Sequence, residues 1–171
     1  LQASVITQIQ VAETSGRLNL VANTVSLTDT GNDFSGELRV NSATAHIVDS
    51  NDLTMTFAGD NLTAQAENLN VNELRAKVDV AITADTANLV STGDLSLQGQ
   101  VGTLNVQARN LSQSDALLVQ GTARVNADNV ELRHQANDFQ AEVALNVLGN
   151  TVVNDQNTLD VSGRVQGNAM F

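Results

Sequence analysis

The sequence predicts an all-β fold, a β-solenoid (parallel β-helix) of about seven coils with a repeat of about 20 residues. Three observations predict it: a corner pattern that recurs, an acidic marker with the same period, and two-residue alternation of apolar residues on both sides of each corner. The composition agrees, because 42% of the residues are hydrophobic, only 2% are aromatic, and Pro is absent. Such a chain favours strands, leaves their hydrogen-bond ladders unbroken, and fills a narrow core with small aliphatic side chains.

The corner pattern is a small residue followed two positions later by Asn or Thr and then by an apolar residue. It is clearest after the alternating stretch that begins at Leu104, where Ala108-Arg-Asn-Leu111 closes the run. Seven small residues open such corners: Ala22, Ser42, Ala66, Ala84, Ala108, Ala127 and Gly149. A pattern that returns at a nearly constant step indicates a repeat architecture.

The second marker is a small or polar residue, then an acid, then an apolar residue. Its acids are Asp33, Asp52, Glu73, Asp94, Asp115 and Asp138, and Thr158 holds the seventh place. The steps between these positions are nearly constant and match the period of the corners. Two markers with one period predict that each repeat is strand, corner, strand, polar turn and strand.

Apolar residues alternate before each corner, as at Leu18 and Leu20, and again on the opposite parity after it, as at Val25 and Leu27. This alternation is typical of strands with one buried face, and a bend at the parity slip keeps that face inward. Since one repeat cannot bury its inner face, stacking of repeats is expected. We expect residues 1–171 to form a single domain, with 1–14 and 160–171 as incomplete terminal coils.

An antiparallel β-jellyroll groove is the alternative fold. Residues 118–132 are similar to the bridge proteins of lipopolysaccharide transport, and this likeness implies a lipid-binding groove with an apolar interior. The corner with its parity slip favours the solenoid, because hairpins usually turn at Asn-Gly or Asp-Gly.

The run L-x-L-x-A-x-x-L, present as Leu18 to Val25 and as Leu104 to Leu111, resembles the repeats of filamentous-haemagglutinin-type exoproteins of two-partner secretion. The resemblance covers roughly residues 16–165. It implies a right-handed parallel β-helix and a role as a surface adhesin or fibre. Leu1 stands where Met is usual, so we expect a processed or an excised segment, and processing would remove a leader. The resemblance also implies a secreted or cell-surface protein of bacteria, and the absence of Cys is compatible with that location.

The net charge of −11 and the eight Lys and Arg residues argue against nucleic acid as a partner. Without Cys there is no disulfide, thiolate metal site or Cys nucleophile. No apolar run approaches the roughly 20 residues that span a bilayer. No nucleophile elbow, phosphate-binding loop or dinucleotide fingerprint is present, so we expect no enzymatic activity and no catalytic residues.

Stacked along one corner of a solenoid, the acids Asp33, Asp52, Glu73, Asp94, Asp115 and Asp138 would form candidate Ca²⁺ sites, since that ion prefers carboxylate oxygens. The competing interpretation, favoured here, is that Asp and Asn are turn residues that face water, with no cofactor. His46 and His134 are expected on the exposed side of strands, and Phe34 and Phe139 in the core. Phe171 is expected to act as a cap or a contact with another subunit.

These features predict a structural protein: a β-solenoid adhesin module or a filament subunit. Open solenoid ends expose strand edges, which add further strands. We therefore expect end-to-end self-association or continuation of a longer solenoid.

Overall fold

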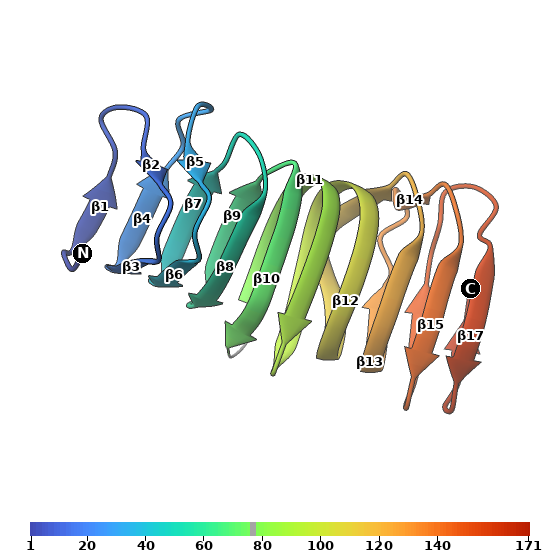
Figure 1. Cartoon of the computed structure of the whole chain (residues 1–171). Coiled ribbons are helices and arrows are strands. Elements are labelled where there is room, and N and C mark those ends of the chain that lie inside the picture. Colours follow the sequence, from blue (N-terminus) through green and yellow to red (C-terminus); the bar gives the residue numbers. More distant parts are fainter. Residues whose placement is uncertain (76–77) are drawn as a thin grey trace.

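The computed structural model of the chain is a β-solenoid, and it describes residues 1–75 and 78–171. Its turns stack along one axis, with the two termini at opposite ends of the stack (Figure 1). One column of paired residues passes through every turn: Leu18, Leu38, Met55, Val71, Leu89, Val106, Val125, Leu145 and Gly163. The eight steps between them correspond to about 38 Å at the usual strand spacing of about 4.8 Å.

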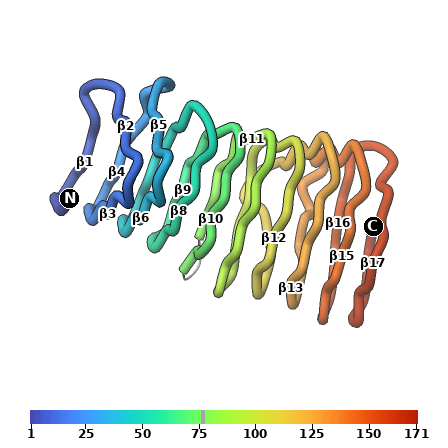
Figure 2. The backbone as a smooth tube through the Cα atoms, viewed as in Figure 1, coloured from blue at the N-terminus to red at the C-terminus, as the bar shows by residue number. Residues whose placement is uncertain are grey.

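The solenoid has about nine turns, whereas the sequence period predicted about seven. The register advances from Leu18 to Leu38 near the N-terminus, but in the middle it advances only from Met55 to Val71. The middle turns are therefore shorter than the predicted repeat. The tube in Figure 2 shows the wider turns at the N-terminal end and the tighter ones in the middle.

Each turn has three faces, which we name by their order along the chain. The first face consists of β3 (Leu18–Val21), β6 (Leu38–Asn41), β8 (Leu53–Ala58), β10 (Asn68–Arg75), the later part of β11 (Val78–Ser91), the middle of β12 (Asp94–Val119), the start of β13 (Ala123–Leu132), β15 (Val143–Val147) and β17 (Val161–Val165). The second face consists of β1 (Val5–Thr7), β4 (Thr24–Leu27), β7 (Thr44–Val48), β9 (Asn61–Gln65), the early part of β11, parts of β12, the end of β13, β16 (Thr151–Val153) and β18 (Ala169–Met170). The third face holds β2 (Glu13–Thr14), β5 (Asp33–Phe34), the end of β12 and β14 (Asp138–Phe139).

The alternation in sequence becomes alternation of burial, as predicted. In β13 the residues Ala123, Val125 and Ala127 are buried, whereas Arg124 and Asn126 are exposed. The buried side chains of all turns form one continuous aliphatic core. Phe34 and Phe139 both lie in it, which confirms their predicted place.

Two of the predicted corners, at Ala66 and Ala84, lie on a different edge of the prism from the corners at Ala108 and Ala127. Ala108 lies between the first and second faces, and so does its partner Ala127. Leu69 instead pairs with Ala87, and Ala87 with Leu104, so these residues begin first-face strands. The corners at Ala66 and Ala84 therefore join the third face to the first. Two kinds of corner share one local pattern, and this is why the sequence period was misread.

The antiparallel jellyroll is excluded for the described part of the chain, because each strand pairing found there is parallel. Parallel neighbours in register, one turn apart, require a solenoid path. The interior that a lipid groove would need is filled by the core.

Candidate functional site

The six acids do not stack along one corner, so the predicted ladder of carboxylates is wrong. Asp33 and Asp138 lie on the third face, and Glu73 lies within β10 on the first. Asp52 directly precedes β8, and Asp94 begins β12 at the corner toward the second face. Asp115 lies further along β12, before the third face. The spacing between successive acids in sequence is longer than most turns of the solenoid. Each acid therefore falls at a different place around the prism from the one before it.

Several of these acids have a partner close to them. Glu73 pairs with Arg75 at 2.9 Å, and Asp94 with Arg109 at 3.0 Å. Asp52 accepts a hydrogen bond from Asn68 Nδ2 at 2.7 Å. Among the residues that the structure describes, no three His, Cys, Asp or Glu side chains gather closely enough to hold a metal ion.

Asp33 and Asp138 share an environment at opposite ends of the molecule. A hydrogen bond from Ser35, and one from Asn51, hold the pKa of Asp33 below its usual value. Hydrogen bonds from Asn157 and from Gln140 lower the pKa of Asp138 in the same way. Both carboxylates are therefore ionised at neutral pH.

The two histidines are exposed, as predicted. His46 lies within β7 on the second face, whereas His134 lies in the loop after β13 instead of a strand. His134 Nε2 is 3.4 Å from Asp115 Oδ1, a contact that sequence spacing did not suggest. The two histidines are too far apart along the axis to act together.

Two buried asparagines carry the most elaborate polar networks of the described residues. Asn32 is fully buried; its Oδ1 accepts from Gln8 Nε2 at 2.7 Å and from the Ala12 N–H at 2.9 Å. Its Nδ2 donates to Gln8 Oε1 at 2.9 Å and to the Val48 carbonyl at 3.0 Å. The amide thus closes the wide loop between β4 and β5, where backbone pairing is interrupted.

Asn137 repeats this arrangement. Its Oδ1 accepts from Gln113 Nε2 at 2.7 Å and from the Leu117 N–H at 3.0 Å. Its Nδ2 donates to Gln113 Oε1 at 3.0 Å and to the Asn154 carbonyl at 3.1 Å. The neighbouring phenylalanines match too, since Phe34 N–H donates to Asp49 and Phe139 N–H to Asp155. We call each set an asparagine bracket, with Gln8 and Asn32 in the first and Gln113 and Asn137 in the second.

The brackets lie six turns apart. Gln8 corresponds to Gln113 and Asn32 to Asn137, and the column of paired residues takes six steps from Leu18 to Val125. Sequence reasoning missed this longer period. Its signal was present as Asn-Asp-Phe at 32–34 and again at 137–139, each with a Gln at the same distance before it.

A family described as "Repeats of unknown function (DUF5649)" matches residues 1–41 and 79–146, nearly two thirds of the chain. The chain belongs to this family. The two DUF5649 matches end at Asn41 and Asn146, which have the same separation in sequence as Asn32 and Asn137. No curated protein and no solved structure matches the chain.

Both ends of the solenoid present strand edges. Among the described strands, β1 at the first turn pairs only with β4, and Leu1 and Val5 are exposed. At the last turn, the same described set leaves β17 paired only with β15, and β18 only with β16. Val161 and Val165 are half-buried there, while Phe171 is exposed. No helix among the described residues is long and apolar enough to cross a membrane.

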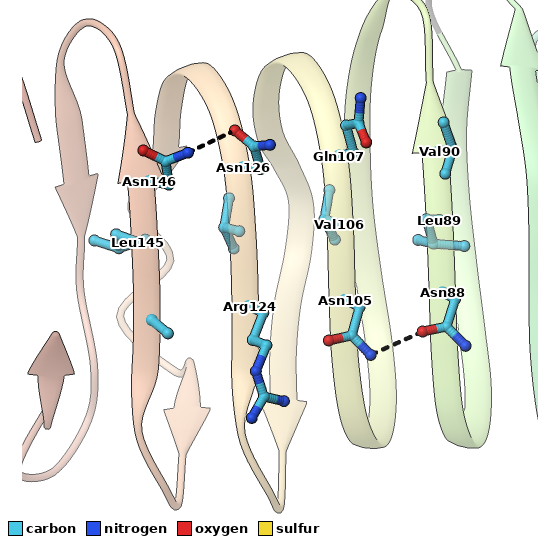
Figure 3. Close-up of a pocket in the computed structure, with 12 residues that line it drawn as sticks. Asn88, Leu89, Val90, Asn105, Val106, Gln107, Arg124, Asn126, Leu145 and Asn146 are labelled. Atoms are coloured by element: carbon cyan, nitrogen blue, oxygen red, sulfur yellow. Dashed lines mark hydrogen bonds between the residues drawn. The ribbon is translucent and has the colours of Figure 1, made fainter. Parts of the chain in front are cut away.

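The first face is shallowly hollowed over β11 to β15 (Figure 3). The hollow measures about 480 Å³ and is lined by amides and small apolar side chains around Arg124. Asn105 Nδ2 donates to Asn88 Oδ1, and Asn146 Nδ2 to Asn126 Oδ1, so the amides bond along the stack. Such a surface offers hydrogen bonds and positive charge.

Proposed function

We propose that the protein is a structural component of the bacterial cell surface or exterior, a β-solenoid adhesin module or a filament subunit. It acts by stacking and by surface contact, without catalysis and without a bound cofactor. The single observation that carries this proposal is the parallel pairing that continues from turn to turn along the described chain and ends in open strand edges at the first and last turns.

The terminal turns support the stacking role. The free edges of β1 and β17 expose backbone groups in the same register as the interior turns, and an exposed edge accepts a further strand. The half-buried Val161 and Val165 would be covered by such an addition. The added turn would come from a second copy or from a longer stretch of the same solenoid.

Two observations support a role outside the cell: the composition of the chain, and its resemblance to filamentous-haemagglutinin-type repeats. The absence of Cys leaves the fold independent of redox conditions, and a net charge of −11 keeps the exposed surface well hydrated. A long prism filled by a continuous aliphatic core is suited to contact and spacing.

The experiment is sedimentation of the purified protein in 0.5 M NaCl, combined with negative-stain electron microscopy. We expect concentration-dependent species longer than one chain. Val165→Lys places a charge on the half-buried end of the core and should reduce assembly at least about tenfold in association constant. Gln166→Lys is the matched control, because it adds the same charge to an exposed residue beside the core, and it should assemble normally. A strictly monomeric wild-type protein at high concentration would contradict end-to-end assembly.

A further inference from the structure

Charge is segregated between the faces of this acidic prism. The outward side chains of the first face include four of the eight Lys and Arg residues, namely Arg39, Arg75, Arg124 and Arg164. One acid, Glu73, points outward among them, and three more acids, Glu37, Glu142 and Asp160, lie at the edge, directly before β6, β15 and β17. The outward side chains of the first-face strands therefore carry a net positive charge in a protein whose net charge is −11.

The third face and its corner toward the first face carry the opposite charge. Backbone contacts hold the successive turns of this surface in register. Glu13 pairs with Asp33, the Glu67 N–H donates to the backbone carbonyl of Asn51, and the Asp85 N–H donates to the backbone carbonyl of Glu67. The half-buried or exposed acids of this surface are Glu13, Asp33, Asp52, Glu67, Asp85 and Asp138. The third-face strands β2, β5 and β14 and the end of β12 contain neither Lys nor Arg, whereas Arg17, at the corner between β2 and β3, pairs with Glu37.

The two charges are incompletely neutralised within one molecule. Arg39 pairs with Glu37, and Arg75 with Glu73. Arg124 and Arg164 make no ion pair within residues 1–75 and 78–171. On the third face, Asp33 and Asp138 are held by hydroxyl and amide groups, which leaves their negative charge in place.

We propose that the positive first face of one copy binds the acidic third face of another copy, so that solenoids associate side by side. Both faces run along the stacking axis, so their charges extend in parallel rows. Arg39 to Arg164 spans seven turns, or about 34 Å, and Asp33 to Asp138 spans six turns, or about 29 Å, at the usual strand spacing. The occupant is a second copy because the complementary surface is present on the same chain.

This contact is heterologous, since two different faces meet, so a pair of copies keeps one first face and one third face free. Such contacts do not close into a dimer and instead extend into ribbons or bundles. Arg164 lies on β17 in the last turn, but the contact uses outward side chains of the faces and leaves the open edges of the terminal strands free, so it is distinct from end-to-end stacking. Small amide side chains, such as Asn105 and Asn126 in the hollow of Figure 3, allow two flat sheets to approach closely.

Ionic strength distinguishes this contact from end-to-end stacking. Charges across the contact lie within a Debye length at 0.1 M salt and are strongly screened at 0.5 M. In the Val165→Lys background, where end contacts are blocked, sedimentation at 0.1 M NaCl should still show association. We expect the apparent Kd to rise at least about tenfold at 0.5 M NaCl.

Charge-reversal variants in the same background test the surfaces directly. Arg124→Glu with Arg164→Glu should abolish self-association, and so should Glu67→Arg with Asp85→Arg. Mixing the two double variants should restore association, because one then offers a positive third face and the other an acidic first face. Arg109→Glu with Arg133→Glu is the matched control, with the same charge change away from both faces, and it should associate as before.

Three outcomes would overturn the proposal: a monomeric protein at 0.1 M NaCl, no association in the mixture of variants, or equal loss in the control. Circular dichroism of each variant checks that the solenoid is intact. Heparin serves as a probe for an anionic polysaccharide. If it binds the first face of a protein that stays monomeric, that face recognises an anionic glycan instead of a second copy.

Discussion

At the scale of single residues, the buried amides of Asn32 and Asn137 replace backbone pairing where the chain leaves the ladder. Each satisfies two acceptors and two donors in the wide loop after the second face. An isolated buried asparagine would be costly, whereas a fully bonded one holds the loop in a single conformation. The equal geometry of both brackets indicates that they perform the same structural task.

Asn137→Ala should therefore lower the free energy of unfolding by about 2–3 kcal/mol, because it leaves the Leu117 N–H and the Asn154 carbonyl unsatisfied. Asn32→Ala should cause a similar loss. Urea unfolding followed by circular dichroism measures both. Asn41→Ala, at an exposed residue of the first face, is the control and should change the value by less than about 0.5 kcal/mol. A loss at Asn137 no larger than at Asn41 would show that the bracket contributes nothing to stability.

At the scale of a strand and its corner, the bend after Ala108 turns β12 from the first face to the second. Ala108 is 8% exposed and pairs with Ala127 in the next turn, so little space remains for a larger side chain. Ala108→Phe should destabilise the fold by about 1–3 kcal/mol or more through overpacking. Gln107→Phe adds the same ring at the exposed neighbouring position and should be nearly neutral. Thermal unfolding of the two variants provides the comparison, and equal melting temperatures would contradict close packing at the corner.

At the scale of the whole molecule, the turns behave as nearly independent layers, each in contact with its two neighbours. Val78 pairs with Leu95, its equivalent in the next turn. Deleting residues 79–95 removes one complete turn and brings Ser96 into the register that Asp79 held against Asn61. Because solenoid stability depends on nearest-neighbour contacts, the shortened chain should fold with lower stability.

Circular dichroism and urea unfolding test this deletion. The variant should keep its β spectrum and unfold cooperatively. Deleting residues 79–87 is the control, since it removes about half a turn and places second-face residues against first-face ones. That protein should not fold. If both deletions fold equally well, the register of the turns does not determine the structure.

The repeated markers separate the features that could be predicted from the sequence from those that could not. The alternation of apolar residues, the parity slip at Ala108 and the buried Phe34 and Phe139 were all predicted, since they depend on local geometry. The number of turns was not, because the corners at Ala66 and Ala108 have the same chemistry on different edges. The acids were misplaced for the same reason. The brackets were missed because their Gln and Asn members are distant in sequence and meet only across turns.

The sequence by itself determined the architecture of this protein: an all-β repeat with a narrow aliphatic core, because period-two burial and stacking follow from residue order. Only the tertiary structure decided which residues share a face. Register is set by backbone pairing between turns of unequal length, and a small difference in length moves a side chain to another face. That pairing places Arg39, Arg75, Arg124 and Arg164 together and gathers acids on the third face, a separation of charge that no linear spacing reveals.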